Sequence, residues 1–250
     1  MASRERLMTV AGATPERRTP PDDVGPAAVA FFGDRLPVAI SYATMLATDG
    51  VVRGLIGPRE ADRIWDRHLL NSVAIEPSLP RDAYVIDVGS GAGLPGLALA
   101  IARPDVRVVL VEPLLRRTTF LSEVVEALGL GAAVTVVRAR AEDVAARPAM
   151  FHVKPADVAT ARAVASLDRL AAWCLPLLRV GGRLLALKGA SAAEEIAAHR
   201  DAVTRLGGGA PTIHGYGVGL LAEPTTVIEV VLERGPAASA EVRRNGRRRR

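Results

Sequence analysis

The stretch VIDVGSGAGLPGLALAIA, residues 85–102, decides the fold. It joins an apolar run to a helix-like run through four glycines, Gly89, Gly91, Gly93 and Gly96. A glycine-rich turn between a strand and a helix lets the backbone approach a ligand closely, and the last three glycines have the G-x-G-x-x-G spacing of dinucleotide sites. The stretch therefore predicts a ligand site at the carboxyl end of a buried strand.

The chain beyond this stretch repeats the order strand, helix, strand. Strand-like runs lie at residues 84–89, 107–112, 133–139, 156–163 and 182–189, and helical runs lie at 95–102 and 114–128. Nearly continuous apolar strands predict a parallel sheet with helices on both faces. Two later runs, 212–216 and 225–234, have too little chain between them for a crossover helix and predict an antiparallel hairpin. The expected fold is α/β, with a doubly wound, mainly parallel, seven-stranded sheet.

Four regions are expected along the chain. Residues 1–25 are rich in proline and lack a period, which predicts disorder. Residues 26–80 form a helical extension, 81–235 form the sheet domain, and 236–250 form a basic disordered tail. Within the extension, PREADRIWDRHLLNSV at 58–73 predicts one helix with a stripe of Ala61, Ile64, Trp65, His68, Leu69 and Ser72.

Composition and charge narrow the protein class. The chain has 250 residues, 49% of them hydrophobic, which is enough for a sizeable core. A single cysteine, Cys174, rules out an internal disulfide, and with no leader or long apolar run a cytoplasmic enzyme without a membrane partner is expected. The net charge is +5, and the last ten residues, EVRRNGRRRR, account for all of it. That tail is either a solvated end or an electrostatic arm for a polyanion.

An acidic residue beside the glycine loop bears on the choice of ligand. Asp87 lies two residues before Gly89, and a carboxylate there would repel a pyrophosphate. S-adenosylmethionine carries cationic sulfonium and ammonium groups, so the same carboxylate would attract it. Glu112, after the second strand, could accept both ribose hydroxyls of either cofactor and does not discriminate. S-adenosylmethionine is thus favoured, and NAD(P) remains an alternative.

Several runs together resemble one known family. They are DVGSGAGLPGLALAIARPD, RVVLVEPLLRRTTFLSEVVEALGL, RARAED, ATARAVASLDRL and LLALKG, with IWDRHLLNSV in the extension. These runs resemble the RsmG (GidB) family of small-subunit ribosomal RNA methyltransferases. The resemblance implies the class I S-adenosylmethionine-dependent methyltransferase fold, which is Rossmann-like. It also implies methyl transfer to N7 of a guanine in 16S ribosomal RNA, either naked or in a small-subunit precursor.

The resemblance also implies site residues. The family's cofactor contacts fall on Gly89, Leu94, Glu112, Ala141, Glu142 and Arg162. With the residues of the glycine loop, the expected cofactor-binding set is Asp87, Gly89, Gly91, Gly93, Leu94, Glu112, Ala141, Glu142 and Arg162. The expected substrate-binding set is His68, Asn71, Arg116 and Arg162. Asn71 departs from the family, which usually has aspartate there, and this loses a charge at an expected substrate-facing position.

The residues themselves agree with N7 chemistry by elimination. The segment after the fourth strand reads ATARAVAS, which lacks the Pro-Pro motif of amino-group methylation, and Cys174 is expected inside a helix rather than free as a nucleophile. N7 of guanine has a free lone pair at neutral pH, so its methylation needs no general base. No general base and no metal are therefore expected, the catalytic residues stay unidentified, and a monomer is expected.

Two residues have competing interpretations. His68 lies on the apolar helical face, so spacing alone favours a core histidine, whereas the resemblance favours a role in the site. Arg162 at the end of the fourth strand requires an anionic partner, either a ligand or an ion pair with Glu142 or Glu112. Arg116 and Arg117 open a helix, where cations are unfavourable, which hints at a phosphate contact. An oxidoreductase and an RNA-binding accessory protein remain as alternatives.

Overall fold

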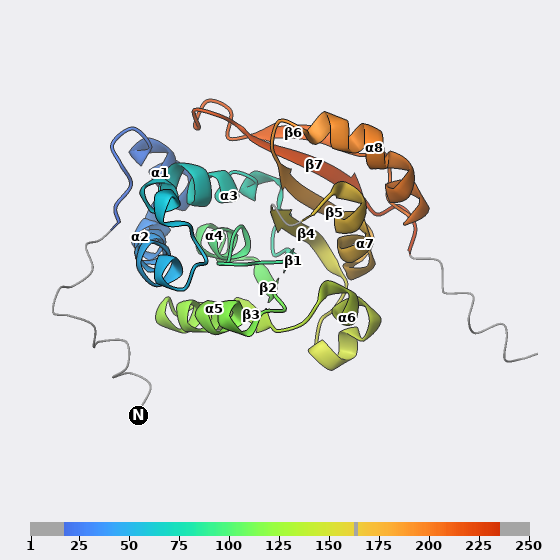
Figure 1. Cartoon of the computed structure of the whole chain (residues 1–250), viewed down its shortest axis with the longest axis horizontal. Coiled ribbons are helices and arrows are strands. Elements are labelled where there is room, and N and C mark those ends of the chain that lie inside the picture. Colours follow the sequence, from blue (N-terminus) through green and yellow to red (C-terminus); the bar gives the residue numbers. More distant parts are fainter. Residues whose placement is uncertain (1–17, 163–164, 236–250) are drawn as a thin grey trace, which may run out of the picture.

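A seven-stranded sheet forms the centre of the structure, a computed structural model that describes residues 18–162 and 165–235. Its strands are β1 (Tyr84–Val88), β2 (Arg107–Val111), β3 (Val134–Val137), β4 (Ala156–Arg162), β5 (Leu178–Lys188), β6 (Thr212–Tyr216) and β7 (Thr225–Val231). Their order is β3-β2-β1-β4-β5-β7-β6 (Figure 1). The first five in this order are parallel, and β7 is antiparallel to both β5 and β6. The predicted fold and its closing hairpin are confirmed.

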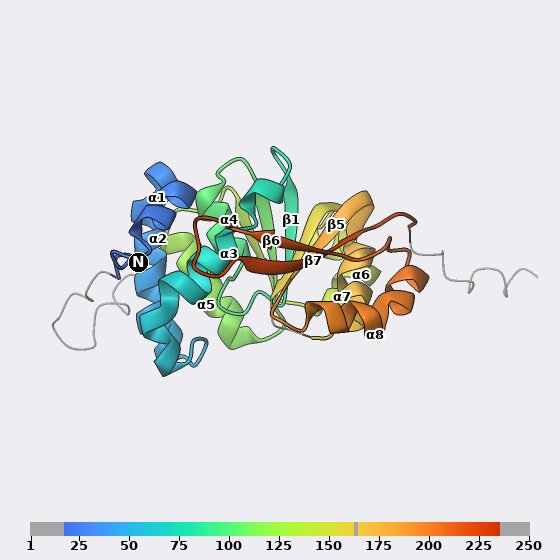
Figure 2. The ribbon, with the colours of Figure 1, turned by 90° about the horizontal axis from the view of Figure 1, so that it is seen from above.

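Alternate residues of the strands point to opposite faces, and both faces are covered. Val85, Val108 and Val158 face one hydrophobic cluster, whereas Ile86 and Val109 face the other. Helices α4 (Gly96–Ala102) and α5 (Leu115–Ala127) lie on the first face with the N-terminal helices. On the second face lie α6 (Ala141–Ala146), α7 (Leu167–Cys174) and α8 (Ala192–Arg205) (Figure 2). Burial on both faces explains why the strands read as apolar runs.

Strand β5 begins four residues earlier than the sequence predicts. The run GRLLALKG predicts a start at residue 182, but β5 begins at Leu178. The pairing with β4 shifts register between Ala156 and Val158, and Gly181 there has φ +80°. Between these two pairs β4 advances by two residues and β5 by five, and such an irregularity breaks the period of two that identifies a strand.

The N-terminal extension packs on the α4 side of the sheet and shares its core. It consists of α1 (Gly25–Phe32), η1 (Gly33–Arg35), α2 (Leu36–Met45), η2 (Leu46–Gly50), η3 (Pro58–Arg63), η4 (Ile64–Leu70), α3 (Asn71–Val73) and η5 (Glu76–Ser78). The segment 58–73, predicted as one helix, is three helical pieces: η3 is a 3₁₀ helix, η4 a π-helix and α3 an α-helix. Its apolar stripe is nevertheless buried at Ile64, Trp65 and Leu69.

The ends of the chain differ partly from expectation. Disorder was expected for residues 1–25, but this is wrong for 18–25. The Arg18 backbone N–H donates to Thr44 Oγ1 at 3.0 Å, and Trp65 Nε1 donates to the Arg18 carbonyl at 2.8 Å. Residues 1–17 and the arginine-rich segment 236–250 lie outside the described residues. None of the helices in the described part is long and apolar enough to cross a membrane.

The order of the strands creates a switch point between β1 and β4. From β1 the chain runs outward to β2 and β3, and then returns to β4 on the other side of β1. Ligands of doubly wound sheets bind where the order reverses, beyond the carboxyl ends of the strands. The glycine loop after β1 and Arg162 at the end of β4 both lie there.

Candidate active site

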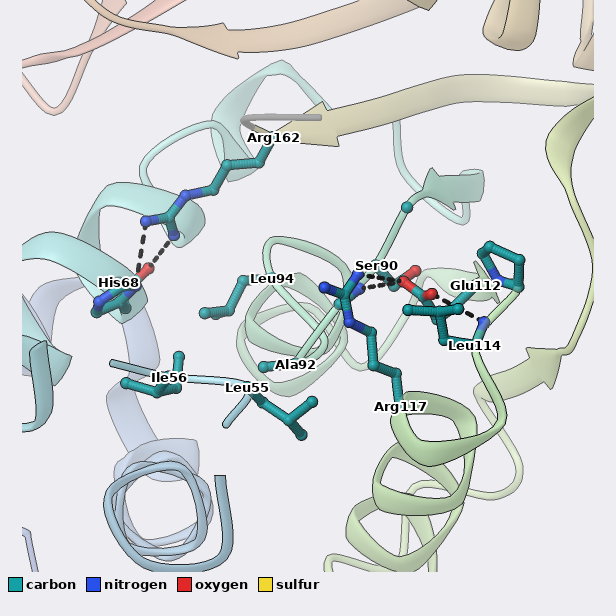
Figure 3. Close-up of a pocket in the computed structure, with 13 residues that line it drawn as sticks. Leu55, Ile56, His68, Ser90, Ala92, Leu94, Glu112, Leu114, Arg117 and Arg162 are labelled. Carbon is teal, nitrogen blue, oxygen red and sulfur yellow. Dashed lines mark hydrogen bonds and ion pairs between the residues drawn. The ribbon is translucent and has the colours of Figure 1, made fainter. Parts of the chain in front are cut away.

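A cavity of about 560 Å³ opens at the switch point. It is lined by residues of the glycine loop, the ends of β2 and β4, the start of α5 and the N-terminal extension: Leu55, Ile56, His68, Gly89, Ser90, Gly91, Ala92, Leu94, Glu112, Pro113, Leu114, Arg117 and Arg162. In Figure 3, Arg162 and His68 lie at one end, and Glu112 and Arg117 lie at the other. Cavities of roughly 300–1,000 Å³ accept small molecules and cofactors, so this one is large enough.

The glycine loop is shaped by two glycines that no other residue could replace easily. Gly93 has φ +102°, and a Cβ there would lie 2.8 Å from the Tyr42 hydroxyl, which itself donates to the Ala92 carbonyl at 2.9 Å. At Gly96 a Cβ would lie 2.9 Å from Asp87 Oδ2. Gly93 therefore packs against helix α2 and does not line the cavity, although the sequence predicted it as a cofactor contact.

Asp87 lies behind the loop, not in the cavity. Its side chain is buried, Oδ1 accepts a hydrogen bond from Thr160 Oγ1 at 2.9 Å, and Oδ2 accepts from the Gly96 N–H at 3.2 Å. Burial raises the pKa of this carboxyl to about 6, against the lowering effect of these hydrogen bonds. The carboxylate thus holds the loop and the start of α4. Its contact with the cofactor, expected from the sequence, stays a prediction.

Glu112 joins three groups around the other end of the cavity. Its buried carboxylate accepts hydrogen bonds from the Gly91 N–H at 3.1 Å and from the Leu114 N–H at 3.0 Å. Arg117 Nη1 lies 3.3 Å from Oε2. A carboxylate offers about four acceptor positions, so Glu112 retains room for a hydroxyl donor.

Arg162 points toward the extension at the opposite end. Its Nη1 donates to Ser72 Oγ at 2.7 Å and to the His68 carbonyl at 3.2 Å, and its Nη2 donates to the Arg67 carbonyl at 2.9 Å. Among the described residues no carboxylate forms an ion pair with it, so neither expected pair, with Glu142 or with Glu112, is present. Burial lowers the pKa of this guanidinium. All the partners of this cation are neutral, so its charge attracts an anion, and with four contacts at Nη1 and Nη2 the N–H group at Nε is the one without a partner among the described residues.

His68 lines the cavity and uses both ring nitrogens. Nε2 lies 3.2 Å from Glu60 Oε2, and Nδ1 lies 3.2 Å from Arg162 Nη2. Burial and, secondarily, the nearby Arg162 charge lower its pKa. Because the ring is partly exposed to the cavity, His68 is part of the site and not a core histidine.

The remaining predicted residues do not line this cavity. Asn71 Nδ2 donates to Thr225 Oγ1 at 2.8 Å, and the Thr225 hydroxyl donates to the Asn71 carbonyl at 3.0 Å, so Asn71 ties the extension to β7. Arg116 is exposed, and its neighbour Arg117 takes the place in the cavity. Ala141 and Glu142 begin α6 beyond the end of β3. Their assignment as cofactor contacts stays a prediction.

Sequence reasoning missed six lining residues: Leu55, Ile56, Ser90, Ala92, Pro113 and Leu114. It named Arg117 only as a hinted phosphate contact, beside Arg116, and one signal could have placed Arg117 in the cavity. It is spaced three and four residues from Phe120 and Leu121, which are buried on the inner side of α5, whereas Arg116 is not on that side. Leu55 and Ile56 lie in a loop between Gly54 and Gly57, and no local pattern relates that loop to a strand end.

Two other features limit the chemistry of the site. Cys174 is buried in α7, and burial raises the pKa of its thiol far above the usual value, so it is not an available nucleophile. Within residues 18–162 and 165–235, no group of three or more His, Cys, Asp or Glu side chains could hold a metal ion.

Two solved structures share the fold. A candidate S-adenosyl-L-methionine-dependent methyltransferase from Methanococcus maripaludis aligns with a TM-score of 0.53 at 13% identity and covers 76% of this chain and 92% of its own. TYW2 from P. horikoshii, in complex with MeSAdo, aligns with a TM-score of 0.52 at 14% identity over 67% of this chain and 63% of its own. At such identities the likeness establishes the architecture alone.

The sequence comparisons establish the family. The ribosomal RNA small subunit methyltransferase G of Salinispora arenicola is 61% identical over 238 residues, covering 94% of this chain and 98% of that relative. The protein of the same name from Corynebacterium efficiens is 52% identical over 227 residues, covering 88% and 96%. The family model GidB, described as rRNA small subunit methyltransferase G, matches residues 35–218. This chain therefore belongs to the rRNA small subunit methyltransferase G family, and S-adenosyl-L-methionine is its methyl donor.

Proposed function

We propose that this protein transfers a methyl group from S-adenosylmethionine to N7 of a guanine in 16S ribosomal RNA by direct in-line displacement. The names of its relatives support a ribosomal RNA substrate, since they are called small subunit methyltransferases. We further propose that the protein acts in the cytoplasm as a monomer, without a metal, on this RNA or on a precursor of the small subunit.

The lining residues suit the parts of the cofactor. Glu112 would accept a ribose hydroxyl at its remaining acceptor position. The backbone of Gly89 and Gly91 and the side chain of Leu94 would lie along the cofactor, and Arg162 would bind its carboxylate. When bound, S-adenosylmethionine supplies an electrophilic methyl group on its sulfonium. By the family resemblance, Ala141 and Glu142 complete the cofactor contacts. Apolar Leu55, Ile56 and Leu114 would exclude water from the reacting centre.

One observation carries the proposal of N7 as the acceptor: none of the described cavity residues is free to act as a base or a nucleophile. Both ring nitrogens of His68 are engaged, and Glu112 already accepts from three donors. N7 of guanine needs no base, because its lone pair is not protonated at neutral pH. The protein then contributes by holding N7, the methyl carbon and the sulfur in line, which can supply roughly 7–11 kcal/mol of a barrier.

The substrate would enter beside the cationic rim of the cavity. Arg117 lines the cavity, and Arg116 is exposed one residue before it at the start of α5. His68 and Arg162 lie at the other end. Arg116, His68, Asn71 and Arg162 were predicted as substrate contacts. Of these, Asn71 is held by Thr225 and would act through the position of α3, while the other three can reach RNA or cofactor.

The alternative functions named from the sequence can be separated from the proposed one. Family membership removes the NAD(P)-dependent oxidoreductase. A methyltransferase of another substrate and an RNA-binding protein without activity are separated by methyl incorporation from labelled S-adenosylmethionine.

The experiment uses ribosomal RNA from a strain that lacks this gene. Purified full-length protein is incubated with naked 16S RNA and with small-subunit particles, and N7-methylguanine is mapped by chain cleavage at the modified base. Label at a single guanine N7, absent with Arg162→Ala, is the expected result. Label on another atom or base would refute the N7 assignment, and no label on either substrate would refute ribosomal RNA methylation.

A further inference from the structure

We propose that Glu60 and His68 form a positioning chain that orients the Arg162 guanidinium in the cofactor cavity. The chain joins the consecutive elements η3 and η4 to β4, whose Arg162 lies 94 residues after His68. This inference rests on the proposed role of Arg162 as a cofactor contact. Glu60 itself does not line the cavity, so it would act through His68 and not by direct contact with the cofactor.

The hydrogen-bond chemistry fixes the direction of the chain. Arginine can only donate, so His68 Nδ1, 3.2 Å from Arg162 Nη2, must accept. A neutral imidazole that accepts at Nδ1 carries its hydrogen on Nε2, and Nε2 lies 3.2 Å from Glu60 Oε2. The Glu60 carboxylate therefore selects the tautomer that Arg162 requires.

Among the described residues, the His68 imidazole is the only ring that accepts a hydrogen bond from Arg162. The other contacts are to Ser72 Oγ and to the carbonyls of Arg67 and His68, and they hold the guanidinium against η4 and α3. In Figure 3 the Arg162 and His68 side chains point toward each other at the edge of the cavity. The ring shares Nη2 with the Arg67 carbonyl and adds the contact that comes from a side chain lining the cavity, so it helps to fix how the guanidinium faces that cavity.

Protonation of His68 would break this arrangement. A protonated ring presents N–H at Nδ1 to the N–H of Arg162 and adds a like charge. The charged groups that face His68 are Glu60 from η3, Arg162 from β4 and Arg67 on its own helix η4. Burial and Arg162 keep the pKa of His68 low, which keeps the ring neutral at physiological pH. Cofactor affinity should therefore fall in acid through this group.

The test measures S-adenosylhomocysteine binding to the purified full-length protein by calorimetry. Glu60→Ala should weaken binding by about three- to tenfold, because one oriented hydrogen bond is lost. Glu60→Gln keeps an acceptor oxygen and should restore binding to within about twofold. Asp66→Asn is the matched control, since Asp66 pairs with exposed Arg63 on the same segment and should have no effect.

A double substitution separates positioning from simple stabilisation. His68→Asn places an amide oxygen near the position of Nδ1, does not titrate and does not reach Glu60. In that background Glu60→Ala should have no further effect, and the loss of affinity between pH 7 and 5 should flatten. Equal effects of Glu60→Ala with histidine or asparagine at residue 68 would overturn the proposal.

The tautomer supplies a readout that does not depend on binding. Long-range proton–nitrogen NMR spectra of the imidazoles should show His68 protonated at Nε2 in the wild type and a mixture of tautomers in Glu60→Ala, with His68→Asn identifying the signal. An unchanged tautomer together with wild-type affinity would refute the chain. If Arg162→Ala binds S-adenosylhomocysteine as tightly as the wild type, the proposed role of Arg162 fails instead.

Discussion

Asp87 and Thr160 face each other across the two strands at the switch point, and the Thr160 hydroxyl donates to Asp87 Oδ1 at 2.9 Å. The other oxygen of this buried carboxylate accepts the Gly96 N–H at the start of α4. One side chain therefore fixes β4, α4 and the loop between β1 and α4. Of these elements, the loop and the end of β4 line the cavity.

Replacement of Asp87 by alanine should destabilise the fold as well as the site. The Thr160 hydroxyl and the Gly96 N–H would both lose their acceptor in a buried place, which costs about 1–3 kcal/mol for each group. We expect the free energy of unfolding in urea to fall by about 2–4 kcal/mol, and cofactor affinity to fall with it. Weaker S-adenosylhomocysteine binding at unchanged stability would contradict this role and favour direct attraction of the cationic cofactor.

Asp87 should also give a distinct pH dependence of stability. Its pKa in the folded state is raised to about 6, above the value of an exposed carboxyl, so the folded state binds a proton more tightly than the unfolded state. Its contribution is then fully present at low pH and is lost as the pH rises through about 6. Asp87→Asn, which cannot ionise, should gain stability relative to the wild type between pH 4 and 7, by about 2–3 kcal/mol at most.

Chemical denaturation at several pH values checks this prediction. Asp105→Asn is a useful comparison: the Arg103 pair lowers the pKa of Asp105, so the contribution of Asp105 is lost only as the pH falls below about 4, and its difference from the wild type should stay constant between pH 4 and 7. A constant difference between Asp87→Asn and the wild type over this range would mean that Asp87 ionises normally.

The comparison of Asp87 with Glu112 shows what the sequence could and could not predict. Strands, glycine loop and hairpin follow from local periodicity and turn residues, so they were predictable. Glu112 was also predictable, because it follows the second strand, at the carboxyl edge of the sheet where ligands bind. Asp87 lies only two residues before the loop, but its side chain points into the sheet, where Thr160 from a distant strand receives it. Contacts between segments far apart in sequence leave no local pattern.

Contacts with distant segments also explain why the structure of the N-terminal extension was only partly predictable. The spacing of apolar residues in 58–73 predicted a helix, but not its division into 3₁₀, π and α pieces. The π-helix coincides with the contacts that Arg162 makes to the Arg67 and His68 carbonyls. Arg162 lies more than ninety residues away, so the sequence of the segment does not reveal the interaction.

Arg162 should matter more for methyl transfer than for stability. Removal of its side chain loses hydrogen bonds to the extension, which lowers the free energy of unfolding. It also removes a buried charge that has no carboxylate partner among the described residues, which raises the free energy of unfolding, so the two effects oppose each other. Arg162→Ala should lower single-turnover methylation by about 100-fold or more, while the free energy of unfolding changes by no more than about 2 kcal/mol. Arg162→Lys keeps the charge without the fork and should remain strongly impaired.

Single-turnover rates and urea unfolding on the same preparations test this balance. Arg183→Ala is the control: Arg183 pairs with Glu229 between β5 and β7, away from the cavity. A large loss of stability with a normal rate would show that Arg162 only joins β4 to the extension.

The loop that carries Leu55 and Ile56 is joined to α5 across the cavity. Arg53 forms an ion pair with Glu123, and its guanidinium lies 5.7 Å from the centre of the Phe120 ring. The loop and the start of α5 flank the cofactor cavity from two sides, so this contact limits how far they separate. Because the two charged side chains are partly exposed, the pair is worth only about 0.5–1 kcal/mol.

Loss of this contact should shorten the residence of the cofactor product. Arg53→Ala and Glu123→Ala should each raise the dissociation rate of S-adenosylhomocysteine by about three- to fivefold, with a smaller change in the association rate. The double variant should dissociate little faster than either single variant, because the two residues act through one interaction. Stopped-flow displacement measures these rates, and Arg147→Ala, which removes the exposed pair with Asp143 on α6, serves as the control. If the effects of Arg53→Ala and Glu123→Ala simply add, the Arg53–Glu123 pair does not hold the loop. Other contacts would then keep Leu55 and Ile56 over the cofactor.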